Sequence, residues 1–328
     1  MSNRSAVAAQ SDSPPVLSIL SNAELPTIAI RYPSAMTNPV HDLVELLQVE
    51  QLELNLFRGV SADIGSPRVF GGQVLGQALM AAALTVEGRT VHSLHAYFLR
   101  PGDKQARIVY DVERIRDGGS FTTRRVVAIQ HGRPIFNMAA SFQVREDGVE
   151  HQTTMPDVPA PEGLASESEL RRQSAHRMPP QLHEIFQRGL PIDIRPLHPT
   201  DLLEPSVRLP RSDAWFRVAD RLPDDPMLHQ AMLAYASDFN LLRTSMLPHG
   251  LSFFQHNVQS ASLDHAMWIH REFRIDDWLL YVTDSPSASH ARGFCRGSIY
   301  TRDGRLVASV AQEGLVRVRA PREASAGT

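Results

Sequence analysis

The feature that most constrains the fold is a repeated pattern, in which one apolar helical segment is followed by four segments with strand composition. In the first copy the helix is expected at 70–84 and the strands at 91–99, 106–116, 120–130 and 134–145. In the second copy the helix is expected at 228–238 and the strands at 266–273, 278–287, 291–301 and 305–318. Because short turn signals separate the strands, each copy predicts a buried helix followed by an antiparallel meander.

The two copies also share a spacing. Arg124 and Arg296 lie in the third strand of their copies, and Gly132 and Gly304 lie in the turn before the last strand, each pair being 172 residues apart. A spacing that covers a whole helix-and-sheet unit indicates duplication rather than a solenoid of short repeats. Before the first copy, residues 41–57 pass from a helical period to alternation, which predicts a helix followed by a strand.

A long helix wrapped by a curved antiparallel sheet is the hotdog arrangement. Two such units in one chain can pair their sheets edge to edge and cover each other's exposed strands, so the sequence predicts an α+β fold of the double hotdog type. The connecting segment between them holds ten of the chain's 23 prolines, which fits a surface connection. The expected divisions are a disordered N-terminal tail at 1–38, a first hotdog unit at 39–146, the connecting segment at 147–212, a second hotdog unit at 213–320 and a C-terminal tail at 321–328.

Composition limits the partners and the compartment. The formal net charge of −3 gives no general attraction to nucleic acid or to anionic membranes, so a nucleotide-like ligand must be bound locally. A single cysteine, Cys295, cannot form an intramolecular disulfide, and no run approaches the roughly 18 to 20 apolar residues that cross a bilayer. We expect a cytoplasmic protein with no nucleic-acid partner and no membrane insertion. Met36 precedes the first amphipathic pattern and is the expected alternative start, which abundant native peptides from residues 1–35 would refute.

The common catalytic motifs are absent. The sequence has no G-x-S-x-G elbow, no P-loop, no H-E-x-x-H and no paired-cysteine spacing, so we expect no metal and no cofactor. The segment FGGQVLG at 70–76 resembles a glycine-rich phosphate loop, but it lacks the G-x-G-x-x-G spacing and a surrounding βαβ pattern. Close packing of the helix on the sheet is one interpretation of these glycines. The other is that free N–H groups at the helix start hold an anion or a polarised carbonyl.

The stretch SASLDHAMWIH at 260–270 places Ser262, Asp264 and His265 close together, as in a compressed serine-hydrolase triad. Successive side chains of a strand point to opposite faces, so Ser262 and Asp264 are expected on one face and His265 on the other. Catalytic triads converge from separated positions, so adjacency in sequence is weak evidence. We therefore predict structural hydrogen-bonding roles for Asp264 and His265.

Three polar residues stand where apolar ones are expected. Asp238 closes an apolar helix, Ser262 begins the first strand after it, and Gln312 interrupts the apolar last strand. Each alone is compatible with a structural polar group that finds hydrogen-bond partners. Their places at the helix end, the first strand and the last strand of one half favour a functional site.

Long motifs in the same order resemble the acyl-CoA thioesterase II family, whose members include bacterial thioesterase B and the peroxisomal acyl-CoA thioesterases. The resemblance covers about residues 41 to 318, and the matching segments are 57–59, 68–79, 91–103, 116–130, 235–242, 262–273, 287–297 and 307–317.

The resemblance implies hydrolysis of fatty acyl-CoA by a water that an Asp, a Ser or Thr and a Gln bind and activate. In this sequence these residues are Asp238 in YASD, Ser262 in SLDH and Gln312 in VAQEG. Two alternatives stay open: a hotdog hydratase or dehydratase acting on acyl-thioesters, and a non-catalytic acyl-CoA binding protein. The chain ends Ser-Ala-Gly-Thr where peroxisomal members end in a Ser-Lys-Leu type signal, which favours a bacterial-type cytoplasmic location. Exposed sheet edges or faces make a homodimer or homotetramer the expected assembly.

Overall fold

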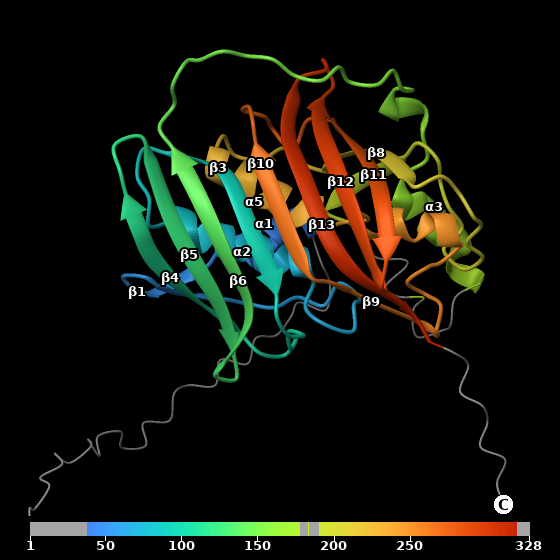
Figure 1. The fold of residues 1–328 in the computed structure, drawn as a ribbon, viewed down its shortest axis with the longest axis horizontal. Helices are drawn as coiled ribbons and strands as arrows, with labels where there is room; N and C mark the ends of the chain where they lie inside the picture. Colours follow the sequence, from blue (N-terminus) through green and yellow to red (C-terminus); the bar gives the residue numbers. More distant parts are fainter. Residues whose placement is uncertain (1–37, 178–182, 184–189, 320–328) are drawn as a thin grey trace, which may run out of the picture. The chain divides into compact units, whose positions relative to one another are not determined.

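A computed structural model describes residues 38–177, 183 and 190–319 of the chain (Figure 1). The helices are α1 (Pro39–Leu47), α2 (Gly71–Ala83), α3 (Glu167–Ser174) and α5 (Pro226–Ser237), with short 3₁₀ turns η1 (Pro161–Gly163), η2 (Ala175–Arg177), η3 (Leu242–Ser245) and η4 (Leu247–His249). The strands are β1 (Glu50–Glu53), β2 (Leu56–Gly59), β3 (Thr90–Phe98), β4 (Ile108–Asp117), β5 (Phe121–Gln130), β6 (Arg133–Gln143), β7 (Ile192–Pro196), β8 (Arg211–Val218), β9 (Val258–Ser262), β10 (Asp264–Ile269), β11 (Leu279–Ser289), β12 (Arg292–Thr301) and β13 (Leu306–Val318). Both predicted tails lie outside the described residues, apart from Asn38, which caps α1. None of the described helices is long and apolar enough to cross a membrane.

The strands form one antiparallel sheet whose two halves mirror each other. Its order is β1-β2-β4-β5-β6-β3-β10-β13-β12-β11-β8-β7, and β9 pairs with β13 beside this path. From its outer edge to the centre, the first half runs β1, β2, β4, β5, β6, β3, and the second half runs β7, β8, β11, β12, β13, β10. In each half an outer hairpin is followed by the two middle strands of the meander, and then by the last and the first strand of that meander. The halves join where β3 pairs with β10, from Ser93 opposite Trp268 to Tyr97 opposite Asp264. The double hotdog architecture is confirmed.

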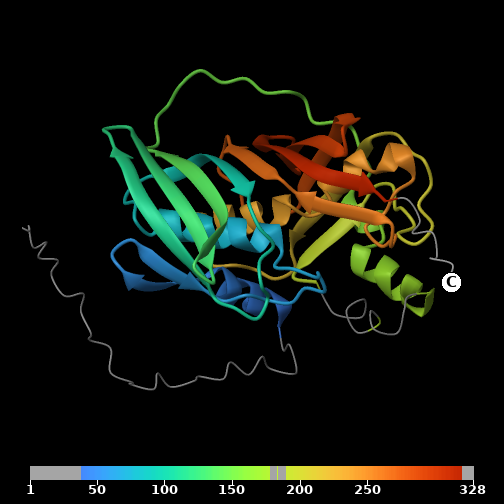
Figure 2. The same ribbon diagram turned by 60° about the horizontal axis from the view of Figure 1, so that its bottom comes forward.

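The helices α2 and α5 lie side by side beneath the sheet (Figure 2). They approach closely because two glycines four residues apart face α5. A Cβ at Gly72 would lie 2.4 Å from the carbonyl oxygen of Tyr235, and one at Gly76 would lie 3.0 Å from that of Ala231. For Gly72 and Gly76 the interpretation of helix-on-sheet packing is therefore wrong, because these two glycines allow close contact between the two helices.

The spacing between equivalent residues of the two copies differs by one residue between the third strand and the turn that follows it. In β5 the exposed Arg125 binds Glu113, and in β12 the exposed Arg296 binds Asp284. The counterpart of Arg296 is therefore Arg125, at a spacing of 296 − 125 = 171 residues, whereas Arg124 is buried. The two turn glycines keep the spacing of 172, and both have positive φ, at 69° and 88°. One extra residue in the second turn accounts for the difference.

The proline-rich connecting segment contains regular structure that the sequence analysis did not predict. It includes α3 and β7, and β8 begins inside it at Arg211. The hairpin of β7 and β8 precedes α5 as the hairpin of β1 and β2 precedes α2. The earlier part of the segment packs on the second half of the sheet, where Trp215 donates to the carbonyl of Pro159 and Tyr300 bonds Thr153. The limits of the two units stay a prediction.

Candidate active site

Asp238 lies at the C-terminal end of α5, the helix that runs under the second half of the sheet. This helix begins with Asp225, whose side chain accepts from the amide of Met227, and continues with Pro226 in the first turn, where a missing N–H costs nothing. Its apolar residues are buried on all sides, so the helix end carries Asp238 into the interior, where 5% of its side chain is exposed. A carboxylate so placed needs donors.

Gln312 supplies the donor. It lies in the interior of β13 and is 1% exposed. Its Nε2 lies 2.6 Å from Oδ1 of Asp238, 3.2 Å from Oγ of Ser262 and 3.3 Å from Nδ1 of His265. The structure therefore brings together all three residues that the sequence analysis selected. If the Gln312 amide were flipped so that Oε1 and Nε2 exchanged places, two acceptor oxygens would lie 2.6 Å apart. Nε2 is therefore the atom that faces Asp238.

His265 also faces this cluster, so the prediction that it lies opposite to Ser262 is wrong. Ser262 pairs with Gly314, whereas Ala266 pairs with Ala311, so four steps on one strand match three on the other. This is a β-bulge, and the extra residue reverses the alternation of side chains. Alternation along a single strand does not reveal the bulge, because a bulge is defined by the pairing with a second strand.

The tautomer of His265 follows from its partners. The hydroxyl of Ser237 donates to the carbonyl of Ala234 at 3.0 Å, and Nε2 of His265 lies 2.9 Å from the same hydroxyl oxygen. Because a hydroxyl has one hydrogen, Nε2 of His265 is the donor in that contact, and Nδ1 is left to accept from Gln312. The neutral ring, fully buried, thus holds Gln312 against Asp238. Burial lowers the pKa of His265, while the nearby Asp238 opposes that shift.

Asp264, the third member of the apparent triad, has a backbone partner. Its Oδ1 accepts from the amide of Glu313 at 2.6 Å, at the bulge. Burial raises the pKa of Asp264, and the Glu313 amide opposes the shift. The contact fits the structural role predicted for Asp264.

The neutral ring of His265 gives a prediction for stability. The unfolded chain has an ordinary histidine pKa near ~6.5, whereas burial lowers the pKa in the folded protein, so the unfolded state binds more protons as the pH falls through this range. We expect the free energy of unfolding to decrease as the pH falls below about 6.5. His92, His229 and His270 also have pKa values lowered by burial and contribute. Thermal unfolding at pH 7.5 to 5.5 should show a shallower slope in His265→Gln, and an unchanged slope would contradict a buried neutral His265.

The start of α2 completes the site from the other half of the chain. A Cβ at Gly71 would lie 2.7 Å from Oδ2 of Asp238 and 2.9 Å from the ring of Phe98. Phe70, the N-cap, provides no side-chain bond to the helix. Within the part of the chain that the structure describes, nothing accepts from the amides of Gly71 or Gly72. The first turn of α2, with two free N–H groups and the positive end of the helix dipole, therefore begins next to the carboxylate.

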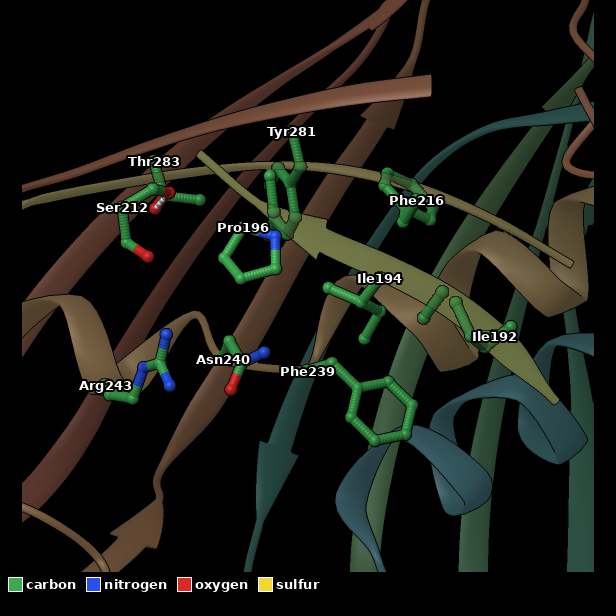
Figure 3. A pocket seen from close by; sticks show the side chains of 12 residues that line it. Ile192, Ile194, Pro196, Ser212, Phe216, Phe239, Asn240, Arg243, Tyr281 and Thr283 are labelled. Atoms are coloured by element: carbon green, nitrogen blue, oxygen red, sulfur yellow. Dashed lines mark hydrogen bonds between the residues drawn. The ribbon is translucent and has the colours of Figure 1, made fainter. Parts of the chain in front are cut away.

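A cavity lies beside the residues that follow Asp238, between the end of α5 and the hairpin of β7 and β8 (Figure 3). One end is apolar, where Ile192, Ile194, Phe216 and Phe239 gather, and the other is polar, where Ser212, Asn240, Arg243 and Thr283 gather. None of these residues was assigned a role from the sequence, and those of β7 and Ser212 lie in the segment interpreted as a connection. Among residues 38–177, 183 and 190–319, no group of three or more His, Cys, Asp or Glu could hold a metal ion.

Comparisons with known proteins identify relatives over both halves of the chain. The family model described as acyl-CoA thioesterase matches residues 203–315, and the one described as acyl-CoA thioesterase N-terminal domain matches residues 60–143. Acyl-CoA thioesterase 2 of Haemophilus influenzae is 41% identical over 284 residues, which are 86% of this chain and 99% of that protein. Human acyl-coenzyme A thioesterase 8 is 42% identical over 284 residues, covering 84% of this chain and 88% of that protein.

A solved structure agrees as well. The crystal structure of an acyl-CoA thioesterase II from Mycobacterium marinum has a TM-score of 0.68 and 44% identity, covering 84% of this chain and 98% of that one. Identity of this extent, over both halves and in the same order, is shared descent rather than a common architecture alone. The chain belongs to the acyl-CoA thioesterase II family.

Proposed function

We propose that the protein hydrolyses fatty acyl-CoA to a free fatty acid and CoA, by direct attack of a water held at Asp238 and Ser262. The observation that carries the proposal is the contact of one Gln312 amide with both Asp238 and Ser262. Family membership supports the reaction, and this geometry supports the residues. The expected assembly as a homodimer or homotetramer stays a prediction.

Oδ2 of Asp238 and the hydroxyl of Ser262 are available to a water, and the buried Oε1 of Gln312 also has no hydrogen-bond partner among the described residues. Both hydrogens of the Gln312 amide are engaged, one by Asp238 and the other by Ser262 and His265. Oδ2 of Asp238 accepts no hydrogen bond from the described residues, and the hydroxyl hydrogen of Ser262 is free to donate. The sequence predicted that Gln312 also holds the water, but its amide hydrogens are engaged by Asp238, Ser262 and His265, so Gln312 positions the two groups instead. Ser262 then donates to the water and Asp238 accepts its proton.

The reaction then needs no covalent intermediate. The water oxygen attacks the thioester carbonyl carbon as its proton passes to Asp238. The resulting oxyanion accepts hydrogen bonds from the free amides of Gly71 and Gly72. When the carbon–sulfur bond breaks, the proton on Asp238 goes to the departing thiolate, whose ordinary thiol pKa near ~8.5 makes it a ready leaving group. Asp238 is ionised again at the end.

Hydration or dehydration of an acyl-thioester would need an imidazole aimed at the acyl chain. His265 lies 4.0 Å from Oδ1 of Asp238, so the two residue types are present together. Both ring nitrogens of His265 are engaged by Ser237 and Gln312, and the ring is fully buried. This arrangement favours hydrolysis over hydration.

Thiol release from acyl-CoA of several chain lengths, measured beside ultraviolet detection of enoyl formation, tests the proposal. We expect stoichiometric free CoA and no enoyl product. Enoyl formation would support a dehydratase, and tight binding of acyl-CoA without thiol release would support a binding protein.

The same assay tests Ser262. Ser262→Thr keeps a hydroxyl donor and should keep turnover within about threefold, whereas Ser262→Ala removes one hydrogen bond to the water and should lower kcat about tenfold. Equal activity of both variants would show that no hydroxyl is needed at this position.

A further inference from the structure

Arg243, in η3 beyond the end of α5, is a mostly buried cation that forms no side-chain hydrogen bond or ion pair with the described residues. Its Nε is buried and has no hydrogen-bond partner among the described residues. The acidic group that attracts it, Glu167, is already bound by Arg171 and by the side-chain amide of Asn240. Its guanidinium lines the polar end of the cavity beside α5 (Figure 3). Since charges this buried are normally paired, the side chain suits an anionic ligand.

A second hollow adjoins that cavity at Ser212, which lines both. It has a volume of about 270 Å³, and basic side chains dominate its polar lining, namely His198, Arg208 and Arg211. The side chain of Arg208 is exposed, and among the described residues its Nη1 donates to the carbonyls of His198 and Pro199 and it forms no ion pair. Arg211 is bound to Asp213. Arg208 is also close enough to repel the charge of Arg243.

We propose that Arg208 and Arg243, with Arg211 and His198 at the rim, bind the phosphate groups of the CoA part of the substrate. The inference rests on the proposed function, because it is the acyl-CoA thioester that brings phosphates to this chain. The net charge of −3 gives no general attraction, so the phosphates need local cations, and guanidinium groups bind phosphate oxygens in pairs.

The position fits the shape of CoA. Phe239 and Asn240 directly follow Asp238 and line the cavity, and the hollow begins at its far side, at Ser212. In acyl-CoA a long, flexible pantetheine arm separates the thioester from the phosphates. A thioester at Asp238 therefore places the phosphates at a distance from the catalytic residues, and the hollow beyond Ser212 is a basic surface separated from Asp238 by the cavity.

The test compares acyl-CoA with the S-acyl-pantetheine of the same acyl group, which has the thioester and the arm but lacks the nucleotide phosphates. For Arg208→Gln we expect kcat/KM for acyl-CoA to fall about tenfold because KM rises. The kcat/KM of the same variant for acyl-pantetheine should stay within about twofold of the wild-type value. Arg243→Gln should act in the same direction. Arg208 is exposed, so its variant remains informative if Arg243→Gln does not fold.

Arg125→Gln is the matched control, because Arg125 is an exposed arginine of the first half bound to Glu113. It should change neither substrate's kcat/KM. Equal losses on both substrates in Arg208→Gln, or no loss on acyl-CoA, would overturn the inference. The affinity for CoA, measured by calorimetry, distinguishes failure of the phosphate site from failure of the hydrolytic function. If the wild type releases no thiol but binds CoA, and Arg208→Gln binds CoA about tenfold more weakly, the hydrolytic function is wrong and the phosphate site is supported.

Discussion

Asp238→Asn is expected to lower kcat by about 10² to 10⁴, which is the usual contribution of a positioned general base. The substitution removes the proton acceptor and keeps the shape of the side chain. Its amide oxygen can still accept from Nε2 of Gln312, now 2.6 Å from Oδ1 of Asp238, so the cluster should stay assembled. Thiol release gives kcat, and thermal unfolding should show a melting temperature close to that of wild type.

Asp264→Asn is the control for this result. Asp264 is another partly buried carboxylate, at the start of β10, and its Oδ1 accepts from the backbone amide of Glu313, which an asparagine oxygen can also do. We expect Asp264→Asn to keep most of the turnover. If instead Asp264→Asn were inactive and Asp238→Asn retained near-normal turnover, the assignment of the base to Asp238 would be wrong.

Gly71→Ala is expected to lower kcat about 100-fold with a small change in stability. The new Cβ would lie 2.7 Å from Oδ2 of Asp238 and 2.9 Å from the ring of Phe98, so the carboxylate must move. That movement disturbs both the base and the space where the oxyanion forms. Steady-state thiol release and denaturant unfolding measure the two effects.

The neighbouring glycine provides the contrast. A Cβ at Gly72 would lie 2.4 Å from the backbone oxygen of Tyr235, which cannot move without shifting α5 against α2. We expect Gly72→Ala to lower the free energy of unfolding by about 1 to 3 kcal/mol, as over-packing does. If Gly71→Ala left turnover intact, the start of α2 would not be part of the site.

Much of the fold followed from periodicity. Both long helices and the strands of both meanders were predicted, because apolar period and turn signals act over a few residues. The hairpin of β7 and β8 was not, since its prolines at 196 and 210 suggested a connection. Edge strands tolerate proline, and β7 lies at the edge of the sheet.

The contact among the three proposed site residues could be anticipated from the sequence, but the arrangement around them only in part. Asp238, Ser262 and Gln312 stood out as polar residues in apolar surroundings, and the structure places them in contact. His265 was assigned to the wrong face, because a β-bulge depends on strand pairing that alternation along one strand does not report. The different roles of the two glycines at the start of α2 could not be told from the sequence, because only the structure shows that Gly71 faces Asp238 and Gly72 faces α5.

Direct attack of water is tested most directly by rapid mixing of the enzyme with an excess of acyl-CoA, followed by acid quenching and mass measurement of the protein. We expect CoA release without a burst and an unmodified protein mass throughout turnover, because no acyl-enzyme forms. A burst of one CoA per active site, with an acyl group on the peptide that holds Ser262 or Asp238, would contradict the mechanism.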